Sequence, residues 1–265
     1  MQSNYLGLLS DINDSGSKCG FCGSPALLAA KEDGICNFCE AYISNETPTK
    51  YKPALSEIQR LIDLGKIEDA KAKTDAMVSG NMDPALLYGA ACIYSFISDF
   101  KYYDLDYARK GFMEENSANI YYSLDMTAKS KEMYYKAISA INNAEGAKNS
   151  AQWLYLLSIS NLSLRRYAEA FNYIIAMKEE PSPAREYLRM VYSVQTKKKD
   201  AYQMATSLVS KGNLNAAYYL AKYYANNGKL KEARSILGKL NPKVRMPAAV
   251  FLLGKIDRLT KETEL

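Results

Sequence analysis

Histidine is absent from all 265 residues of the chain. It is the side chain that most readily exchanges a proton near neutral pH, and the commonest metal ligand. Its absence excludes Ser–His and Cys–His nucleophile pairs. The sequence also has no glycine-rich phosphate-binding loop and no metal motif with an open coordination position. We therefore expect a protein that is not an enzyme and has no small-molecule substrate.

Long apolar runs are also missing. None reaches the ~18 residues needed to span a bilayer, and Met1–Ser10 has neither a basic segment nor a long apolar core. We expect no membrane contact, no secretory signal and a cytoplasmic location. With 48% hydrophobic and 24% charged residues, the composition is ordinary for a folded soluble protein.

Charge is distributed unevenly along the chain. Residues 1–164 carry 15 lysines and arginines against 20 acidic residues, whereas residues 165–265 carry 19 against 9. The front is therefore acidic and the back strongly basic. Such a division favours steering of a charged partner, although it is also compatible with a simply solvated surface.

Cysteine is scarce, but four of the five cysteines form two C-x₂-C pairs separated by thirteen residues. This spacing is typical of a structural zinc site, in which both sulfurs of each pair reach one ion. We predict that Cys19, Cys22, Cys36 and Cys39 bind one structural Zn²⁺ as thiolates, in a closed tetrahedral site. Disulfides and rubredoxin-like iron are the alternatives, and disulfides would require an oxidising compartment.

The cysteine segment resembles zinc ribbon and treble-clef modules. Asp33-Gly34 is a turn signal between two possible short strands, as in a ribbon, whereas a helix over Cys39–Ile43 would indicate a treble clef. The same spacing occurs in the first finger of nuclear-receptor DNA-binding modules. The stretch after Cys39 is acidic and lacks Lys and Arg, so we do not expect it to read DNA.

Four segments follow from these patterns. Residues 1–17 are predicted to form a flexible or docking arm, 18–45 the zinc-binding module, 46–53 a polar linker, and 54–265 a helical-repeat domain. Pro53 suits the first turn of the first repeat helix. The fifth cysteine, Cys92, lies in an apolar helical stretch and is predicted to be a core residue rather than a nucleophile.

A helical unit recurs through the long C-terminal segment. Apolar or small residues repeat at i, i+4 and i+7, at Ala70, Thr74 and Met77; Ala170, Ile174 and Met177; Ala201, Ala205 and Leu208; and Ala233, Leu237 and Leu240. The alanines Ala170, Ala201 and Ala233 are 31 and 32 residues apart. Pro242 closes the last unit, and the stretch from Asp83 to Asn143 is irregular, with longer helices.

This pattern resembles the tetratricopeptide repeat, in which a small residue, a turn glycine, an early alanine and a late proline mark each hairpin. Ala221, Gly228, Ala233 and Pro242 fit it, while Arg165 replaces the turn glycine and Ser158 and Arg189 replace the small residue. The resemblance implies an all-α, right-handed superhelix of antiparallel hairpins beside the zinc module. Another helical solenoid or a compact bundle is the alternative.

The resemblance also implies a function. Stacked hairpins form a concave groove, lined by their first helices, that binds an extended peptide or helix. We therefore expect a non-catalytic adaptor that holds protein partners in this groove, with a last helix from Pro247 capping the stack. The alternative is an RNA- or ribosome-associated factor that uses Lys197, Lys198, Lys199 and the basic C-terminal face.

Overall fold

The computed structural model describes residues 52–64, 66–102, 114–144, 150–178, 183–211, 213–240 and 247–262. In these ranges the regular structure is α-helical and no strand occurs, which confirms the all-α class. The arm at 1–17, the zinc module at 18–45 and residues 46–51 of the linker lie outside the described residues. The first described helix begins at Lys52, with Pro53 in its first turn, where a proline sacrifices only an amide that has no helical partner.

The helices follow one another with mostly short connections. Their bounds are α3 (Lys52–Asp63), α4 (Ile67–Val78), α5 (Pro84–Tyr102), α7 (Glu114–Asn143), α8 (Ala151–Ser163), α9 (Tyr167–Ala176), α10 (Pro183–Gln195), α11 (Ala201–Ser210), α12 (Leu214–Asn226), α13 (Leu230–Leu240) and α14 (Pro247–Glu262). Across the described ranges, no helix combines the length and apolar character needed to cross a membrane.

One turn geometry joins the two helices of four hairpins. A backbone amide just after the first helix donates to a carbonyl five residues back, in the pairs Lys66–Leu61, Arg166–Asn161, Lys198–Ser193 and Lys229–Tyr224, at 2.8–2.9 Å. The residue before the donor is left-handed in three of these turns, with φ of 59° at Arg165, 56° at Lys197 and 74° at Gly228. Arg165, which the sequence places where the turn glycine belongs, therefore does lie in the turn between α8 and α9.

The second helix of each hairpin buries the predicted apolar set. Eleven of these twelve side chains are buried and Met77 is partly buried, in α4 (Ala70, Thr74, Met77), α9 and the residue after it (Ala170, Ile174, Met177), α11 (Ala201, Ala205, Leu208) and α13 (Ala233, Leu237, Leu240). The first position is alanine each time and is completely buried. A residue without a long side chain lets two helices approach closely at this point.

The irregular middle of the sequence forms the long pair α5 and α7, of 19 and 30 residues. Asp83 caps α5 by accepting hydrogen bonds from the amides of Ala85 and Leu86. Ser98 Oγ lies 2.7 Å from Thr127 Oγ1, and Ser130 Oγ donates to the carbonyl of Ala91. Ser98, later in α5, meets Thr127, and Ala91, earlier in α5, meets Ser130, so the two helices run antiparallel. Their length agrees with the longer helices expected in this region.

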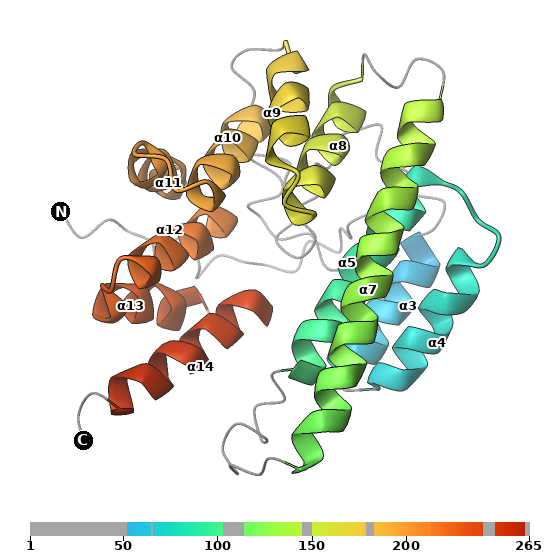
Figure 1. Cartoon of the computed structure of the whole chain (residues 1–265), viewed down its shortest axis with the longest axis horizontal. Coiled ribbons are helices and arrows are strands. Elements are labelled where there is room, and N and C mark those ends of the chain that lie inside the picture. Colours follow the sequence, from blue (N-terminus) through green and yellow to red (C-terminus); the bar gives the residue numbers. More distant parts are fainter. Residues whose placement is uncertain are drawn as a thin grey trace.

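The helices curl so that the last helix, α14, returns to contact α5. In Figure 1, α3, α4, α5 and α7 form one side of the molecule, and α8 to α13 follow as a stack on the other. α8 contacts both α7 and α10, which joins the two parts. The last helix, predicted only to cap the stack, packs on α13 and also contacts α5. Sequence periodicity carries no information on such a contact between distant elements.

Helix α8 lies at the centre of this arrangement. Every residue from Gln152 to Leu162 is buried except the partly buried Trp153, because α7, α9 and α10 all pack against it. An α-helix that is apolar on all sides is a core helix. Three of its polar side chains bond to its own backbone: Ser158 Oγ donates to the carbonyl of Leu154 at 2.7 Å, Asn161 Nδ2 to that of Leu157 and Ser163 Oγ to that of Ile159.

Candidate functional site

Cationic residues gather at the turns of the last three hairpins. Because the first helix ends and the second begins at each turn, these residues lie at one edge of the stack. The exposed ones are Arg165 at the α8–α9 turn, Lys197, Lys198 and Lys199 at the α10–α11 turn, and Lys229 and Lys231 at the α12–α13 turn. The structure thus places the predicted lysine triplet on the surface, in line with further cations.

Aromatic contacts between hairpins lie beside these turns. Phe171 follows the buried Ala170 and stacks on Tyr192 of α10, with centroids 5.1 Å apart and planes at 26°. Tyr202 follows the buried Ala201 and contacts Tyr223 of α12, with ring centroids 5.6 Å apart. In both cases, therefore, the residue directly after the buried alanine of a second helix contacts the first helix of the next hairpin. Phe171 and Tyr202 remain 42% and 41% exposed, so these rings also form part of the surface.

Tyr202 belongs to a small polar aromatic cluster. The hydroxyl of Tyr224 donates to the hydroxyl of Tyr202 at 3.4 Å, and Lys229 Nζ lies 5.8 Å from the centre of the Tyr224 ring. The hydrogen bond between the hydroxyls raises the pKa of Tyr224 to about 12 and lowers the pKa of Tyr202. The cluster therefore presents a partly exposed ring, a hydroxyl that accepts a hydrogen bond and a nearby ammonium group.

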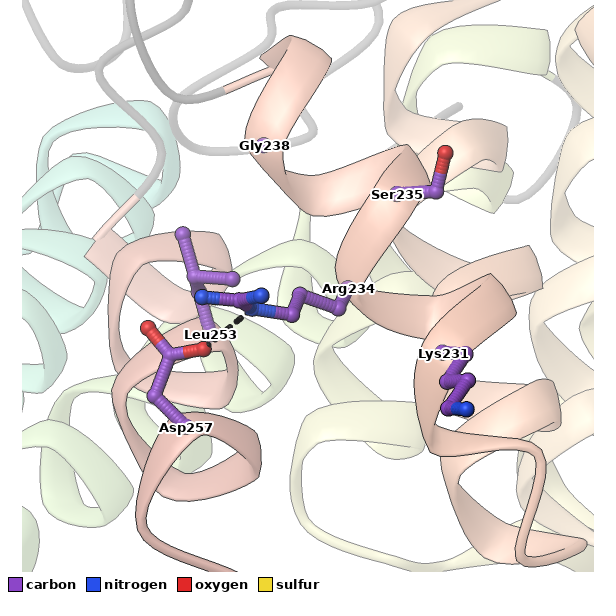
Figure 2. A pocket seen from close by; sticks show the side chains of 6 residues that line it. All are labelled: Lys231, Arg234, Ser235, Gly238, Leu253 and Asp257. Atoms are coloured by element: carbon purple, nitrogen blue, oxygen red, sulfur yellow. Dashed lines mark hydrogen bonds and ion pairs between the residues drawn. The ribbon is translucent and has the colours of Figure 1, made fainter. Parts of the chain in front are cut away.

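In the last hairpin, α12–α13, an ion pair takes the place of the aromatic contact. Arg234 follows the buried Ala233, and its Nε lies 2.6 Å from Asp257 Oδ1 on α14. This pair lines a pocket of about 520 Å³ between the two helices (Figure 2), together with Lys231, Ser235, Gly238 and Leu253. Among the described residues of its lining, the one carboxylate, that of Asp257, is already paired with a guanidinium. The pocket therefore offers no free base and reads as a solvent-filled groove between the last hairpin and α14.

A second polar cluster ties the first hairpin to α5 and α7. Asp75 Oδ1 accepts hydrogen bonds from Tyr94 at 2.6 Å and Lys129 at 2.9 Å, and Oδ2 accepts one from Lys71 at 2.9 Å. Burial alone would raise the pKa of Asp75, but these donors outweigh it and lower the pKa to about 2. Burial and the bond to Asp75 raise the pKa of Tyr94. Since the carboxylate is saturated with donors, we read this cluster as structural.

The other predicted site residues divide into two groups. Cys92 is buried, with its sulfur 3.5 Å from the Tyr134 hydroxyl, which confirms it as a core residue. Cys19, Cys22, Cys36 and Cys39 lie outside the described residues. In the helical part that the structure does describe, no three Cys, Asp or Glu side chains come together as a metal site.

Sequence reasoning missed the surface aromatic contacts, although a signal for them was present. Phe171 and Tyr202 are 31 residues apart and stand directly after equivalent alanines. A search for residues that recur at the repeat period outside the buried set would have found both. Of the neighbouring tyrosines Tyr134 and Tyr135, Tyr134 is buried and Tyr135 is 51% exposed, since adjacent residues of a helix face different directions.

Comparison with known proteins identifies no relative. No family model matches the chain, and neither a curated protein nor a solved structure matches it. The function must therefore be argued from the surfaces described above.

Proposed function

We propose that this chain is a non-catalytic, zinc-binding helical-repeat adaptor that holds a protein partner within a larger assembly. The observation that carries the proposal is the recurrence of one turn geometry and one buried alanine-led set in four hairpins. Hairpins of this kind bury one face only when neighbours stack on them, and the array extends its surface with each added unit. Such arrays serve as docking surfaces in the tetratricopeptide repeat, which the sequence resembles.

The contact with the partner lies, in this proposal, on the second helix of the α8–α9 hairpin. The first helix, α8, is almost wholly buried and leaves little surface for a groove. On α9, by contrast, Phe171 and Ile175 are 42% and 53% exposed, and residues four apart share one helical face. We call these two residues the α9 patch. Stacking of Phe171 on Tyr192 holds the Phe171 ring in place, which reduces the side-chain conformational entropy lost on binding.

A matched pair of variants on α9 tests this placement. The chain is used as bait at physiological salt, the captured protein is identified, and its affinity for the purified chain is measured. Ile175→Asp puts a charge into the α9 patch and should weaken binding at least about 10-fold, since burying an unpaired carboxylate is costly. Ala176→Asp adds the same charge at an exposed site on the same helix that is neither three nor four residues from Phe171 or Ile175, and it should leave the affinity unchanged. Equal losses in both variants, or none in either, would reject the α9 patch.

The N-terminal module contributes the second contact in this proposal. Cys19, Cys22, Cys36 and Cys39 would bind one Zn²⁺, and their C-x₂-C-x₁₃-C-x₂-C spacing is what supports the assignment. With four thiolates the ion has no open position, so its role would be structural. The rest of the helical array would hold the module near the partner, in the manner of an adaptor.

A further inference from the structure

Two adjacent turns concentrate positive charge at one end of the stack. Between residues 197 and 234 the chain has eight lysines and arginines and two acidic residues. Lys197, Lys198 and Lys199 are all exposed, and none of the three is ion-paired within the described residues. Unpaired cations repel one another and gain most from an anionic ligand, so this concentration favours a polyanion.

The backbone at Lys197 adds a second observation. Its φ of 56° is left-handed, a conformation that glycine adopts at the equivalent place in the next turn, Gly228. A left-handed lysine costs stability that a glycine would not. Backbone strain of this sort can indicate function when the sequence has a side-chain-bearing residue at a position that glycine would occupy without strain. Here the strain holds a lysine at the tip of the turn.

An exposed aromatic platform lies between these two turns. Tyr202 is the second residue of α11 and lies three residues after Lys199, with the exposed Asp200 between them. Its ring centroid lies 5.6 and 5.9 Å from those of Tyr223 and Tyr224 near the end of α12. Lys229, at the next turn, lies over Tyr224. We call Lys197, Lys198, Lys199, Lys229 and the ring of Tyr202 the turn edge. The turn edge therefore combines cations with a partly exposed ring that packs against the rings of Tyr223 and Tyr224.

The alternation decides between possible polyanions. An acidic protein segment can pair its carboxylates with the lysines, but it must also supply an apolar side chain at the right place for the ring, whereas every nucleotide of a single strand carries both a phosphate and a flat base. A duplex keeps its bases stacked internally and presents only phosphates. A single strand can place phosphates on the lysines and stack an unpaired base on the tyrosine. The paired hydroxyls of Tyr202 and Tyr224 also supply an acceptor and donor suited to a ribose 2′-hydroxyl, which is present only in RNA.

We propose that the turn edge binds single-stranded RNA, with phosphates on Lys197, Lys198, Lys199 and Lys229 and one base stacked on Tyr202. This surface is separate from the α9 patch. A failure of the RNA-binding test would therefore leave the protein-binding proposal intact, and the reverse also holds.

Fluorescence anisotropy of the full chain with a labelled single-stranded RNA of about 12 nucleotides tests the proposal. Binding should weaken with salt. Replacing Lys197, Lys198 and Lys199 together by Glu should reduce the affinity for RNA at least about 10-fold. It should also make the slope of log affinity against log salt concentration shallower by about two, since each lost phosphate contact accounts for about 0.7. Reversing Lys131, Lys136 and Lys178, which are also exposed, changes the net charge equally and should have a much smaller effect.

The aromatic part of the proposal has its own variants. Tyr202→Leu removes stacking but keeps apolar contact with the neighbouring rings, and should weaken RNA binding about 10-fold. Tyr202→Phe keeps the ring and should bind within about 3-fold of the unchanged chain. Thermal unfolding of each variant shows whether the fold is intact.

Four results would overturn the assignment. They are equal affinity for duplex RNA, equal affinity for single-stranded DNA, tighter binding of a polyglutamate peptide than of RNA, and equal loss of RNA binding in the two lysine reversals. Selective binding of single-stranded RNA that depends on both the lysine triplet and the Tyr202 ring supports it.

Discussion

Arg165 and Lys197, 32 residues apart in the sequence, adopt the same left-handed backbone conformation, with φ of 59° and 56°. Each follows the first helix of a hairpin and allows the next amide to bond to a carbonyl five residues back. In the third such turn the position is Gly228. The turn geometry is therefore conserved within the chain while the residue that forms it changes.

Replacing Lys197 by Gly should stabilise the protein. The left-handed conformation costs a side-chain-bearing residue about 1 kcal/mol more than glycine, so the free energy of unfolding of Lys197→Gly should rise by about that amount. Lys198→Gly removes the same charge at a position without positive φ and should be neutral or destabilising. Chemical denaturation of the two variants checks this, and a gain in both would assign the effect to charge rather than to the backbone.

The buried set of the second helices should dominate stability. Ile174 is 1% exposed and its neighbour Ile175 is 53% exposed. Ile174→Ala should lower the free energy of unfolding by about 2–5 kcal/mol, since it leaves a cavity between α9 and its neighbours. Ile175→Ala should change it by about 0.5 kcal/mol or less. Similar losses in the two variants, measured by urea denaturation, would contradict the packing described for α9.

Acid should weaken the junction between α4, α5 and α7. The pKa of Asp75 is lowered from 3.8 to about 2 by donors that outweigh the effect of burial. Because the folded pKa lies below the unfolded one, ionised Asp75 stabilises the fold above about pH 4, and this contribution is lost as the pH falls towards 2. The melting temperature of the unchanged chain should therefore fall more steeply between about pH 5 and pH 2 than that of Asp75→Asn. Parallel curves would show that Asp75 makes no contribution of this kind.

Removal of metal should act locally. If Cys19, Cys22, Cys36 and Cys39 hold one zinc ion, the purified chain should contain one equivalent of zinc, and a chelator should remove it while most of the helical circular dichroism remains. Cys36→Ser should lose the metal, whereas Cys92→Ala should retain it because Cys92 is buried in the helical core. Collapse of the whole helical signal on chelation would contradict a separate module, and iron or no metal would contradict the zinc assignment.

Local features of this fold were predictable from sequence, and long-range ones were not. The triplet Ala233, Leu237 and Leu240 was predicted from spacing alone, because a helix that buries one stripe must repeat its apolar residues at the helical period. The turn at Arg165 was predicted from the break between two such helices. The contact of α14 with α5 could not be predicted, since it depends on how small rotations between hairpins accumulate over the whole array.

The candidate surface was predicted in part. The lysine triplet at 197–199 was named from the sequence as a possible RNA or ribosome contact, and the structure exposes it at the α10–α11 turn. The roles of Phe171 and Tyr202 were missed because an aromatic residue in a helix fits a core position equally well. Only the three-dimensional structure shows that each ring meets the next hairpin and stays partly exposed.

The central claim, that the chain is an adaptor for a protein, is tested most directly by affinity purification at physiological salt, with half of the sample treated with nuclease before washing. The account predicts that the same one or two proteins remain in both halves and that Ile175→Asp, but not Ala176→Asp, releases them. Material that is ribosomal or RNA-bound and disappears entirely with nuclease would contradict it, and would make the basic half from Arg165 onward the principal functional surface.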